Sequence, residues 1–261
     1  MGVEPSSLAP AVTRAVRALD ILAEAGGAPV PLAELARRLA AAKSSTLNVC
    51  GVLEQAGLIR REAGGYLLGH HTAELGGAYL RGFDIVREFY RLTADSEVLA
   101  RVLVNLAILV GTDAIYIGRH EGAAPLRVSA GVGDRLPAAL TAVGGALLAE
   151  LSPEEVDGLF RGYPFPRLTD RSTRDLPELR AKLAANRQRG HSIDLGESTP
   201  GVIGLGVAVP AARGGQAWAV GVSLIVGPGA EADLPEPRAG IVLEALRGLA
   251  ERLGNPMAQP A

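Results

Sequence analysis

Apolar residues recur at helical spacing in three successive segments near the start of the chain. In the first, from Val12 to Leu22, they return every three or four positions, and Gly26 follows where a helix favours a left-handed residue at its end. The second segment, residues 31–40, opens with a proline, which suits a first helical turn. The third runs from residue 44 to residue 55 and is followed by a glycine. The pattern therefore predicts three short helices joined by tight turns.

A β-hairpin is predicted directly after the third helix. Two short apolar segments, residues 58–59 and 66–68, flank the glycine pair Gly64-Gly65, which favours a tight turn. Three helices followed by a hairpin are typical of the winged helix-turn-helix, whose second motif helix enters the major groove of DNA. Residues 44–55 would form that helix.

The pattern changes along the rest of the chain. A longer helical segment, residues 72–92 with a weak point at Gly82, is predicted to connect to a second domain. Strands and helices then alternate irregularly, with adjacent strands that favour antiparallel pairing. The predicted strands are residues 101–110, 114–122, 125–131, 204–209 and 218–226. The predicted helices are residues 141–151, 152–160, 175–190 and 237–254, the second of which opens with a capping box. This order predicts an α+β sheet domain.

The chain thus divides into three predicted parts: a winged helix-turn-helix at residues 8–70, a linker helix at 71–95 and a second domain at 96–254. With 261 residues and 48% hydrophobic content, it can bury a core without covalent cross-links. The one cysteine, Cys50, excludes an intramolecular disulfide, which fits a reducing cytoplasm. No apolar run is long enough to span a membrane, so we expect a soluble, cytoplasmic protein without membrane contact.

Charge is only weakly segregated between these parts. The net charge is −2 overall, and the first 82 residues carry eight cations and seven anions, a net charge of +1. A difference this small does not identify a nucleic-acid binder. Function is therefore indicated by the order and spacing of the residues, and not by net charge.

Four segments of the chain resemble the IclR family of bacterial transcriptional regulators. They are RAVRALDIL, PLAELARRLAAAKSSTLNVCGVLEQAGLIRREAGGYLLG, PLRVSAGVGDRLPAALTAVGGALLAEL and LRAKLAANRQRGHSIDLGESTPGVIGLGVAVP. The resemblance extends from about Val12 to Leu253. It implies a winged helix-turn-helix, a linker helix that dimerises, and a GAF-like domain that binds a small, often acidic effector. It also implies homodimers or homotetramers on palindromic operators of double-stranded DNA.

The candidate DNA contacts lie in the predicted recognition helix, on the wing and on the second helix. They are Lys43, Ser44, Ser45, Thr46, Asn48, Arg60, Arg61, Arg37 and Arg38. Asn48 is the candidate for base reading, because an amide can pair with adenine through two hydrogen bonds, and the arginines would contact phosphates. Alternatively, Ser44 or Ser45 only caps the helix and Asn48 is a solvated surface residue. Family members commonly carry a histidine or tyrosine and then an arginine where this chain has Leu47 and Asn48. We therefore expect either an operator sequence that differs from those of such members or weak binding to DNA.

The resemblance also places an effector cavity in the second domain. Its candidate residues are Val128, Gly131, Gly133, Thr141, Ala142, Val143, Asp194, Gly204, Leu224 and Val226. The two loop glycines could present backbone N–H groups to a carboxylate, or simply form an ordinary turn. Better-known members place a cysteine and serines where this chain has Gly204, Leu224 and Val226. We therefore expect a more apolar cavity that favours an apolar or aromatic acid over a two- or three-carbon acid.

Motifs for catalysis, cofactors or metals are absent from the pattern. The glycines of GVIGLG, residues 201–206, lack the strand, loop and helix order of a dinucleotide site, and the four histidines are scattered. No GxSxG, P-loop or HExxH sequence occurs. We expect a ligand-responsive transcription factor without cofactor or metal. A scaffold with weakened DNA binding and a small-molecule enzyme on the second domain are the alternatives.

Overall fold

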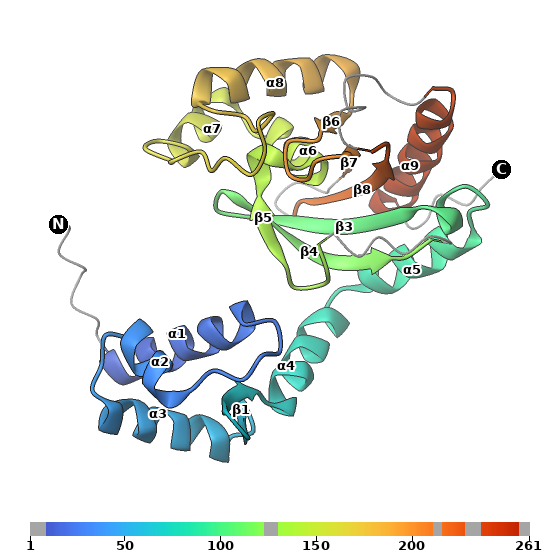
Figure 1. Cartoon of the computed structure of the whole chain (residues 1–261). Coiled ribbons are helices and arrows are strands. Elements are labelled where there is room, and N and C mark those ends of the chain that lie inside the picture. The colour runs from blue at the N-terminus through green and yellow to red at the C-terminus, as the bar shows by residue number, and fades with distance from the viewer. Residues whose placement is uncertain (1–8, 123–129, 211–215, 228–235, 256–261) are drawn as a thin grey trace. The chain divides into compact units, whose positions relative to one another are not determined.

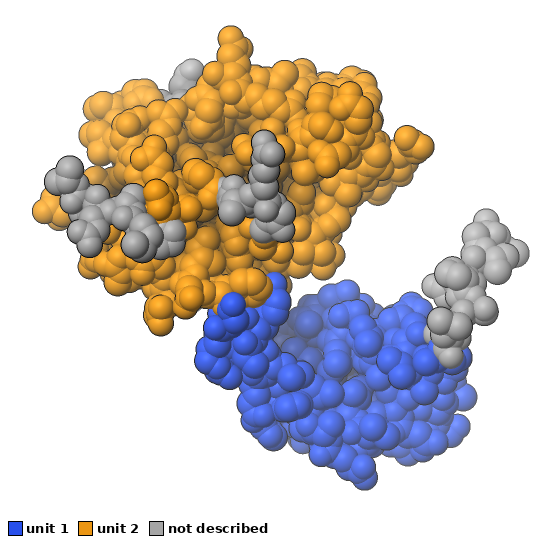
Figure 2. Space-filling model, turned by 180° about the vertical axis from the view of Figure 1, so that it is seen from behind, with its two compact units in different colours: residues 1–82 blue, residues 83–261 orange. Residues whose placement is uncertain are grey.

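The computed structural model describes residues 9–122, 130–210, 216–227 and 236–255. The chain forms two compact units, Met1–Gly82 and Phe83–Ala261, which are coloured separately in Figure 2. Most of the predicted strand at 125–131 lies outside the described residues.

The amino-terminal unit is three helices followed by a hairpin and a further helix (Figure 1). In order they are α1 (Pro10–Glu24), α2 (Leu32–Arg38), α3 (Lys43–Gln55), β1 (Ile59–Glu62), β2 (Gly65–Leu68) and α4 (His70–Arg81). The two strands pair antiparallel from Ile59↔Leu68 to Glu62↔Gly65, so the turn is Ala63-Gly64. The core of this unit contains Ala18 of α1, Leu35 of α2 and Cys50 of α3, all fully buried. This arrangement confirms the predicted winged helix-turn-helix.

The start of α3 differs from the prediction. The helix begins at Lys43, its N-cap is Ala42, and no side chain caps it. The Thr46 hydroxyl instead donates to the Ala42 carbonyl at 3.1 Å, and the Ser45 hydroxyl accepts from Arg14. The prediction that Ser44 or Ser45 caps this helix is therefore wrong, because the helix begins one residue before Ser44.

The predicted linker helix is two helices. The first, α4, ends at Arg81, and α5 (Asp84–Asp95) begins after a break at Gly82 and Phe83. None of the residues of α4 is buried. By contrast, α5 buries Phe89 and its apolar neighbours against the sheet of the second unit, where Gly118 leaves room for the ring. Packing therefore assigns α5 to the carboxy-terminal unit.

The carboxy-terminal unit is built on a six-stranded antiparallel sheet in the order β5-β4-β3-β8-β7-β6. The strands are β3 (Leu103–Val110), β4 (Asp113–His120), β5 (Arg135–Pro137), β6 (Ser192–Leu195), β7 (Val202–Val209) and β8 (Trp218–Ile225). The short strands β5 and β6 are not predicted from the sequence. Both lie at the edges of the sheet. They have only three and four residues, which is too short for a clear alternation of apolar and polar side chains.

Helices cover both faces of this sheet (Figure 1). The helical elements are η1 (Leu99–Arg101), η2 (Ala138–Leu140), α6 (Ala142–Ala149), α7 (Pro153–Leu159), α8 (Leu176–Arg189) and α9 (Arg238–Gly254). One face carries α6, with α8 packed on it, and the other carries α5 and α9. The predicted capping box of α7, Ser152 with Glu155, is present. The α+β class is confirmed.

Glycines allow α6 to approach the sheet closely. A Cβ atom on Gly206 would lie 2.2 Å from the Ala142 carbonyl oxygen, and one on Gly221 would lie 2.6 Å from a Val143 methyl carbon. Both distances are shorter than van der Waals contact. The first turn of α6 therefore lies directly on β7 and β8.

Candidate functional site

The first turns of α3 present a small polar surface. Lys43, Ser44 and Asn48 are exposed, as the prediction of DNA contact requires. Thr46 is fully buried and its hydroxyl is used within the helix. Thr46 therefore belongs to the core, and we remove it from the predicted DNA contacts.

A cation that the sequence analysis did not single out lies beside this surface. The Arg14 guanidinium, from α1, donates to the Ser45 hydroxyl oxygen at 2.8 Å. A positive charge is thus held at the amino-terminal end of α3, where backbone N–H groups already favour anions. Arg14 lies 31 residues before Ser45, so only the packing of α1 on α3 reveals this pairing.

The arginines predicted to attract phosphates have partners in their own unit. Arg37 pairs with Glu34 at 2.5 Å, and this hydrogen bond lowers the pKa of the Glu34 carboxyl. Arg38 pairs with Glu24, and Arg60 pairs with Glu62. The Arg61 guanidinium carbon lies 5.3 Å from the centre of the Tyr66 ring, a cation–π contact that leaves its N–H groups available to a phosphate. Arg61 is therefore the wing residue with the strongest claim to a phosphate.

The outer face of α3 is also apolar. Val52 of α3 is 67% exposed and Val12 of α1 is 62% exposed, and with Asn48 they line a shallow groove between the two helices. Leu47 is exposed as well. Apolar side chains beside an amide can contact thymine methyl groups, so this face suits A·T-containing sites.

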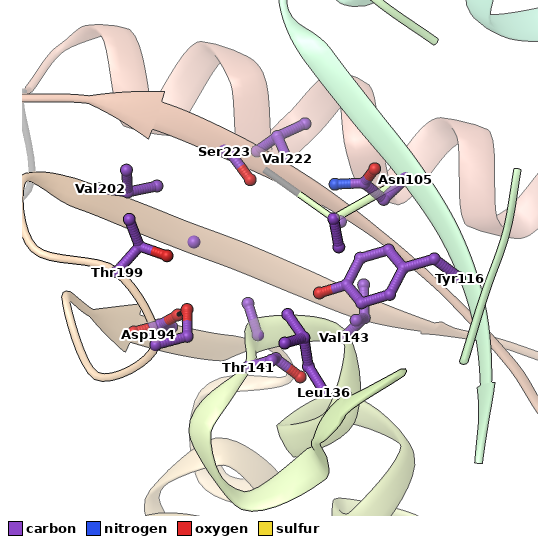
Figure 3. Close-up of a pocket in the computed structure, with 15 residues that line it drawn as sticks. Asn105, Tyr116, Leu136, Thr141, Val143, Asp194, Thr199, Val202, Val222 and Ser223 are labelled. Atoms are coloured by element: carbon purple, nitrogen blue, oxygen red, sulfur yellow. Dashed lines mark hydrogen bonds between the residues drawn. The ribbon is translucent and has the colours of Figure 1, made fainter. Parts of the chain in front are cut away.

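In the second unit, a pocket lies between the start of α6 and the sheet (Figure 3). Its volume is about 40 Å³. The lining residues are Asn105, Tyr116, Ala130, Leu136, Thr141, Ala142, Val143, Asp194, Ser198, Thr199, Val202, Gly204, Gly221, Val222 and Ser223. The site is thus small and partly enclosed.

Half of the predicted effector residues line this pocket. They are Thr141, Ala142, Val143, Asp194 and Gly204. Val128 lies outside the described residues. Gly131 and Gly133 are not in the lining, and their N–H groups donate to the Asp134 carboxylate and the Tyr116 carbonyl. Neither N–H group is therefore directed at a ligand.

The two residues predicted to reach the cavity from β8, Leu224 and Val226, do not line the pocket. Ser223 pairs with Gly204 across the strands and shares its face, so Leu224 points to the opposite face and is buried there. Val226 follows the end of the strand. The strand register thus places a serine, not a leucine, in the pocket. With Asn105, Tyr116, Ser198 and Thr199 also in the lining, the expectation of a mainly apolar cavity is wrong.

A row of paired residues forms one side of the pocket. Asp194, Gly204 and Ser223 are partners across β6, β7 and β8. Because adjacent strands lie about 4.8 Å apart, the outer two Cα atoms are roughly 10 Å apart, with a glycine between them. A Cβ atom on Gly204 would lie 2.9 Å from that of Ala142. The absence of a side chain at Gly204 therefore keeps the space open.

Asn105 reaches the pocket from β3 (Figure 3). Its side chain is almost completely buried, and among the described residues its Oδ1 atom has no hydrogen-bond partner. A buried amide oxygen without a partner costs about 1–3 kcal/mol. The sequence alone could have indicated this pocket residue, since Asn105 is the one polar residue in the apolar run LVNLAILV.

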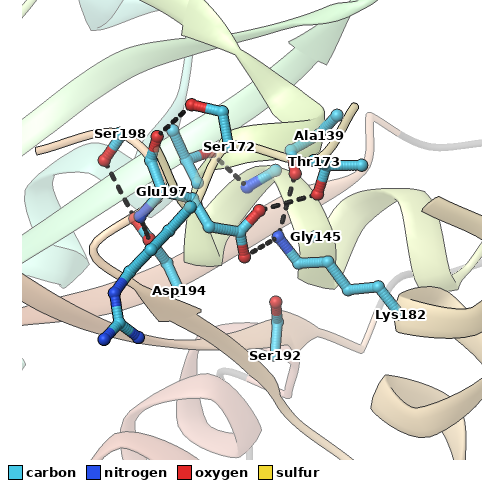
Figure 4. Close-up of polar contacts among 12 residues, drawn as sticks. Ala139, Gly145, Ser172, Thr173, Lys182, Ser192, Asp194, Glu197 and Ser198 are labelled. Carbon is cyan, nitrogen blue, oxygen red and sulfur yellow. Dashed lines mark hydrogen bonds and ion pairs between the residues drawn. The ribbon is translucent and has the colours of Figure 1, made fainter. Parts of the chain in front are cut away.

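Asp194 is held by a polar network (Figure 4). Its carboxylate oxygens accept from the Glu197 backbone N–H at 2.6 Å and from the Ser198 hydroxyl at 2.9 Å. The Lys182 ammonium donates to Glu197 at 2.6 Å and to the Ala139 carbonyl at 2.9 Å, and Thr173 donates to the other Glu197 oxygen. Burial raises the pKa of Asp194 to about 6, although the nearby Lys182 charge and these hydrogen bonds oppose that rise.

The same pocket contains a phenol. The pKa of Tyr116 is raised, first by burial and then by the Asp194 charge, while a hydrogen bond with Thr141 opposes the rise. Tyr116 is therefore a neutral hydrogen-bonding group at neutral pH. Among the described residues, no group of three or more histidine, cysteine or acidic side chains is arranged to hold a metal ion. None of the described helices is long and apolar enough to cross a membrane.

Two family models match the chain. One, described as the IclR helix-turn-helix domain, matches residues 11–63, and the other, the bacterial transcriptional regulator IclR C-terminal domain, matches residues 77–253. The chain is 29% identical over 187 residues to the transcriptional repressor IclR of Escherichia coli strain K12, covering 70% of this chain and 68% of that repressor. These matches confirm the predicted resemblance and the predicted regulator rather than an enzyme.

Solved structures support the same assignment. The repressor BlcR of Agobacterium tumefaciens is 33% identical, with a TM-score of 0.60 over 98% of this chain and 100% of that one. An IclR homologue from Microbacterium hydrocarbonoxydans, complexed with 4-hydroxybenzoate, has a TM-score of 0.75 at 23% identity, covering 94% of this chain and 97% of that one. The latter shows the shared fold.

Proposed function

Because the chain belongs to the IclR family of bacterial transcriptional regulators, we propose that it binds a palindromic operator as a homo-oligomer and that a small molecule in the Asp194 pocket changes its affinity for that DNA. The observation that carries this proposal is the exposed Asn48 on the outer face of α3, between Lys43 and the apolar Val52. An amide placed beside apolar groups suits reading of adenine and thymine. Arg14 and Arg61 supply attraction to the backbone.

A binding assay on selected DNA tests this proposal. A duplex selected by the protein from a random pool is titrated in a mobility-shift assay beside a scrambled duplex. Asn48→Ala should reduce the preference for the selected duplex about tenfold, because one base contact is typically worth about 1–3 kcal/mol. Lys43→Ala serves as the comparison, since a phosphate contact weakens both duplexes alike. If Asn48→Ala lowers the affinity for both duplexes equally, Asn48 does not contact a base.

The exposed apolar residues of α4 support self-association. Leu75 is 52% exposed and Tyr79 is 48% exposed on a helix with no buried residue. A second copy that covers this face would place two α3 helices on one palindrome. Leu75→Glu should lower the mass measured by sedimentation, whereas Leu168→Glu, at a similarly exposed leucine of the other unit, should not. An unchanged mass for Leu75→Glu would exclude α4 from the interface.

A small-molecule ligand is supported by the buried polar lining of the pocket and by the ligand-bound Microbacterium homologue. The expectation of an apolar or aromatic acid rested on Gly204, Leu224 and Val226, of which only Gly204 lines the pocket, and the polar lining does not support it. Operator titrations with and without candidate compounds test the coupling between pocket and DNA. A compound that binds the pocket and leaves DNA affinity unchanged would refute it.

A scaffold with weakened DNA binding is the second candidate. It is favoured by the ion pairs of Arg37, Arg38 and Arg60, because phosphates must displace those carboxylates. It predicts a nearly flat dependence of DNA affinity on salt, whereas a regulator that contacts several phosphates loses affinity steeply. The salt series of the same mobility-shift assay separates the two.

A further inference from the structure

A surface hollow lies between the end of α7 and the start of α8. Its volume is about 570 Å³, within the range of about 300–1,000 Å³ that is usual for binding pockets. Its apolar wall is formed by the rings of Phe160, Tyr163 and Phe165 and by Leu176 at the start of α8. Among the described residues, none lines both this hollow and the Asp194 pocket. The hollow is therefore a separate site.

The aromatic wall is held in one conformation. Phe165 has a φ of +44°, in the left-handed region that a bulky side chain rarely adopts. Its ring stacks on Phe160 with the ring centres 5.7 Å apart and meets the Tyr163 ring edge-on at 5.1 Å. A strained residue of this kind persists only where its surroundings fix it, and such residues concentrate at binding sites.

The loop between α7 and α8 is tied to the chain that follows β6. The Thr169 hydroxyl donates to the Gly196 carbonyl at 2.8 Å, and the Ser172 hydroxyl donates to the Glu197 carbonyl at 2.8 Å. The Thr173 hydroxyl donates to the Glu197 carboxylate at 2.7 Å (Figure 4). A wall that is already ordered loses little entropy when a partner binds. The hollow is therefore preformed.

Three arginines surround the hollow. Arg180 donates to Asp157 at 2.6 Å, and Arg174 donates to Glu178 at 3.1 Å, so both guanidinium groups are held in place. Arg161 is exposed and forms no ion pair or hydrogen bond with any described residue. Arg161 therefore offers an unpaired guanidinium to an anion at the rim of the hollow.

The basic character extends beyond the hollow. Residues 161–191 carry eight lysines and arginines and three acidic residues, a net charge of +5. Residues 83–261 as a whole carry 18 cations and 21 anions, a net charge of −3. The loop beside the hollow also exposes Arg167 and Arg171, with the apolar Leu168 between them. A basic surface wider than the hollow suits a macromolecular partner better than a metabolite.

The chemistry of the hollow favours protein over nucleic acid as that partner. DNA phosphates would meet the arginines but leave the aromatic wall uncovered. An acidic protein segment supplies carboxylates for the guanidinium groups and also an apolar side chain that fills the hollow.

We propose that the hollow binds an acidic segment of a partner protein. Carboxylates of the segment pair with Arg161 and the two neighbouring arginines, and one aromatic side chain packs on Tyr163 and Leu176. The inference does not depend on the proposed function, because the binding is measured without DNA and outside the Asp194 pocket.

A labelled peptide tests this proposal. The probe is fluorescein-labelled Glu-Asp-Glu-Phe-Glu-Asp-Glu, which is too large for the Asp194 pocket of about 40 Å³. Fluorescence anisotropy with the full chain should give a Kd on the order of 100 µM. Replacing phenylalanine by alanine in the probe should weaken binding about tenfold, because one ring is no longer buried. Replacing the acids by the corresponding amides should weaken it by a similar factor of about ten.

Two variants of the chain locate the binding. Arg161→Glu should weaken the probe about tenfold, because it reverses the charge at the rim and the exposed side chain leaves the fold intact. Arg238→Glu is the matched control, since Arg238 is exposed at the start of α9 and does not line the hollow. It makes the same change in net charge and should leave the Kd unchanged.

Three peptide results would overturn the inference: no binding of the probe at about 1 mM, equal binding of the probe without phenylalanine, or equal losses for the two variants. A labelled duplex of scrambled sequence is titrated with the same variants. If Arg161→Glu weakens binding of the duplex and leaves binding of the peptide unchanged, the surface binds nucleic acid and the inference is also overturned.

Discussion

Among the described residues, both units carry exposed ion pairs, but only the carboxy-terminal unit also holds a pair in which both side chains are largely buried. In the amino-terminal unit, Arg37 and Glu34 form an ion pair whose side chains are 72% and 40% exposed, whereas Lys182 and Glu197 of the other unit are 12% exposed each. An exposed pair contributes about 0–1 kcal/mol, but removing one partner of a buried pair leaves a charge that costs about 3–5 kcal/mol. The first unit can therefore exchange its partners for phosphates, while the second holds a pocket in one geometry.

The largest expected effect comes from breaking the buried pair. Lys182→Met should lower the free energy of unfolding of the carboxy-terminal unit by about 3 kcal/mol, because Glu197 remains buried without its cation. Urea denaturation followed by the fluorescence of Trp218 measures this, since the one tryptophan of the chain lies in that unit.

Arg180 on the same helix is the matched control. It pairs with Asp157, and the two side chains are 50% and 37% exposed, so Arg180→Met should cost less than about 1 kcal/mol. Replacing both Lys182 and Glu197 by methionine should recover much of the loss. Equal losses for the two single variants would show that burial does not separate the two kinds of ion pair.

The next effect tests how tightly each unit is packed. Gly206→Ala should destabilise the carboxy-terminal unit by about 1–3 kcal/mol, because the added methyl meets the Ala142 carbonyl oxygen and α6 must move. Gly51→Ala lies inside α3 with no atom within 4 Å of the added methyl, and should stabilise its helix by about 1 kcal/mol. Circular dichroism during thermal unfolding compares the two variants. A destabilising Gly51→Ala would contradict the contrast.

A pH dependence sharpens the role of the buried carboxyl. The pKa of Asp194 is raised to about 6 by burial, with Lys182, Glu197 and Tyr116 facing it, so the folded unit keeps a proton that the unfolded chain releases. The Asp194 contribution to stability therefore falls as pH rises from about 4 to 6 and is constant above that range.

Urea denaturation at about pH 4 and about pH 7, followed by the fluorescence of Trp218, measures this change. Asp194→Asn should remove the Asp194 contribution to the difference between the two pH values. An identical pH dependence in Asp194→Asn and the unsubstituted chain would show that this carboxyl does not cause it.

The smallest effect concerns phosphate attraction. Arg61→Ala should weaken binding to selected and scrambled DNA alike, by about fivefold at low salt, and reduce the salt slope by about one. Arg37→Ala should reduce DNA affinity and the salt slope less, because the Arg37 guanidinium is already paired with Glu34. Mobility shifts over a salt series compare the two. If Arg37→Ala has the larger effect, the ion pair does not limit phosphate contact.

Local pattern predicted the elements that carry a strong period. The three helices and the hairpin of the first unit, the β3–β4 hairpin and the capping box of α7 are all present. Edge strands β5 and β6 were missed, because three or four residues carry too little alternation to detect. The linker was predicted as one helix because Gly82 alone does not show that α5 packs on a sheet that follows it in the chain.

The sequence by itself determined the family, the two-part organisation and the exposed polar turn of α3, since these depend on the order and spacing of neighbouring residues. Only the tertiary structure decided which side chains meet. Packing of α1 on α3 brings Arg14 to Ser45, and the register of β7 with β8 places Ser223 instead of Leu224 in the pocket. A shift of one residue in a strand exchanges the two faces, and such a shift leaves no trace in the pattern of a buried strand.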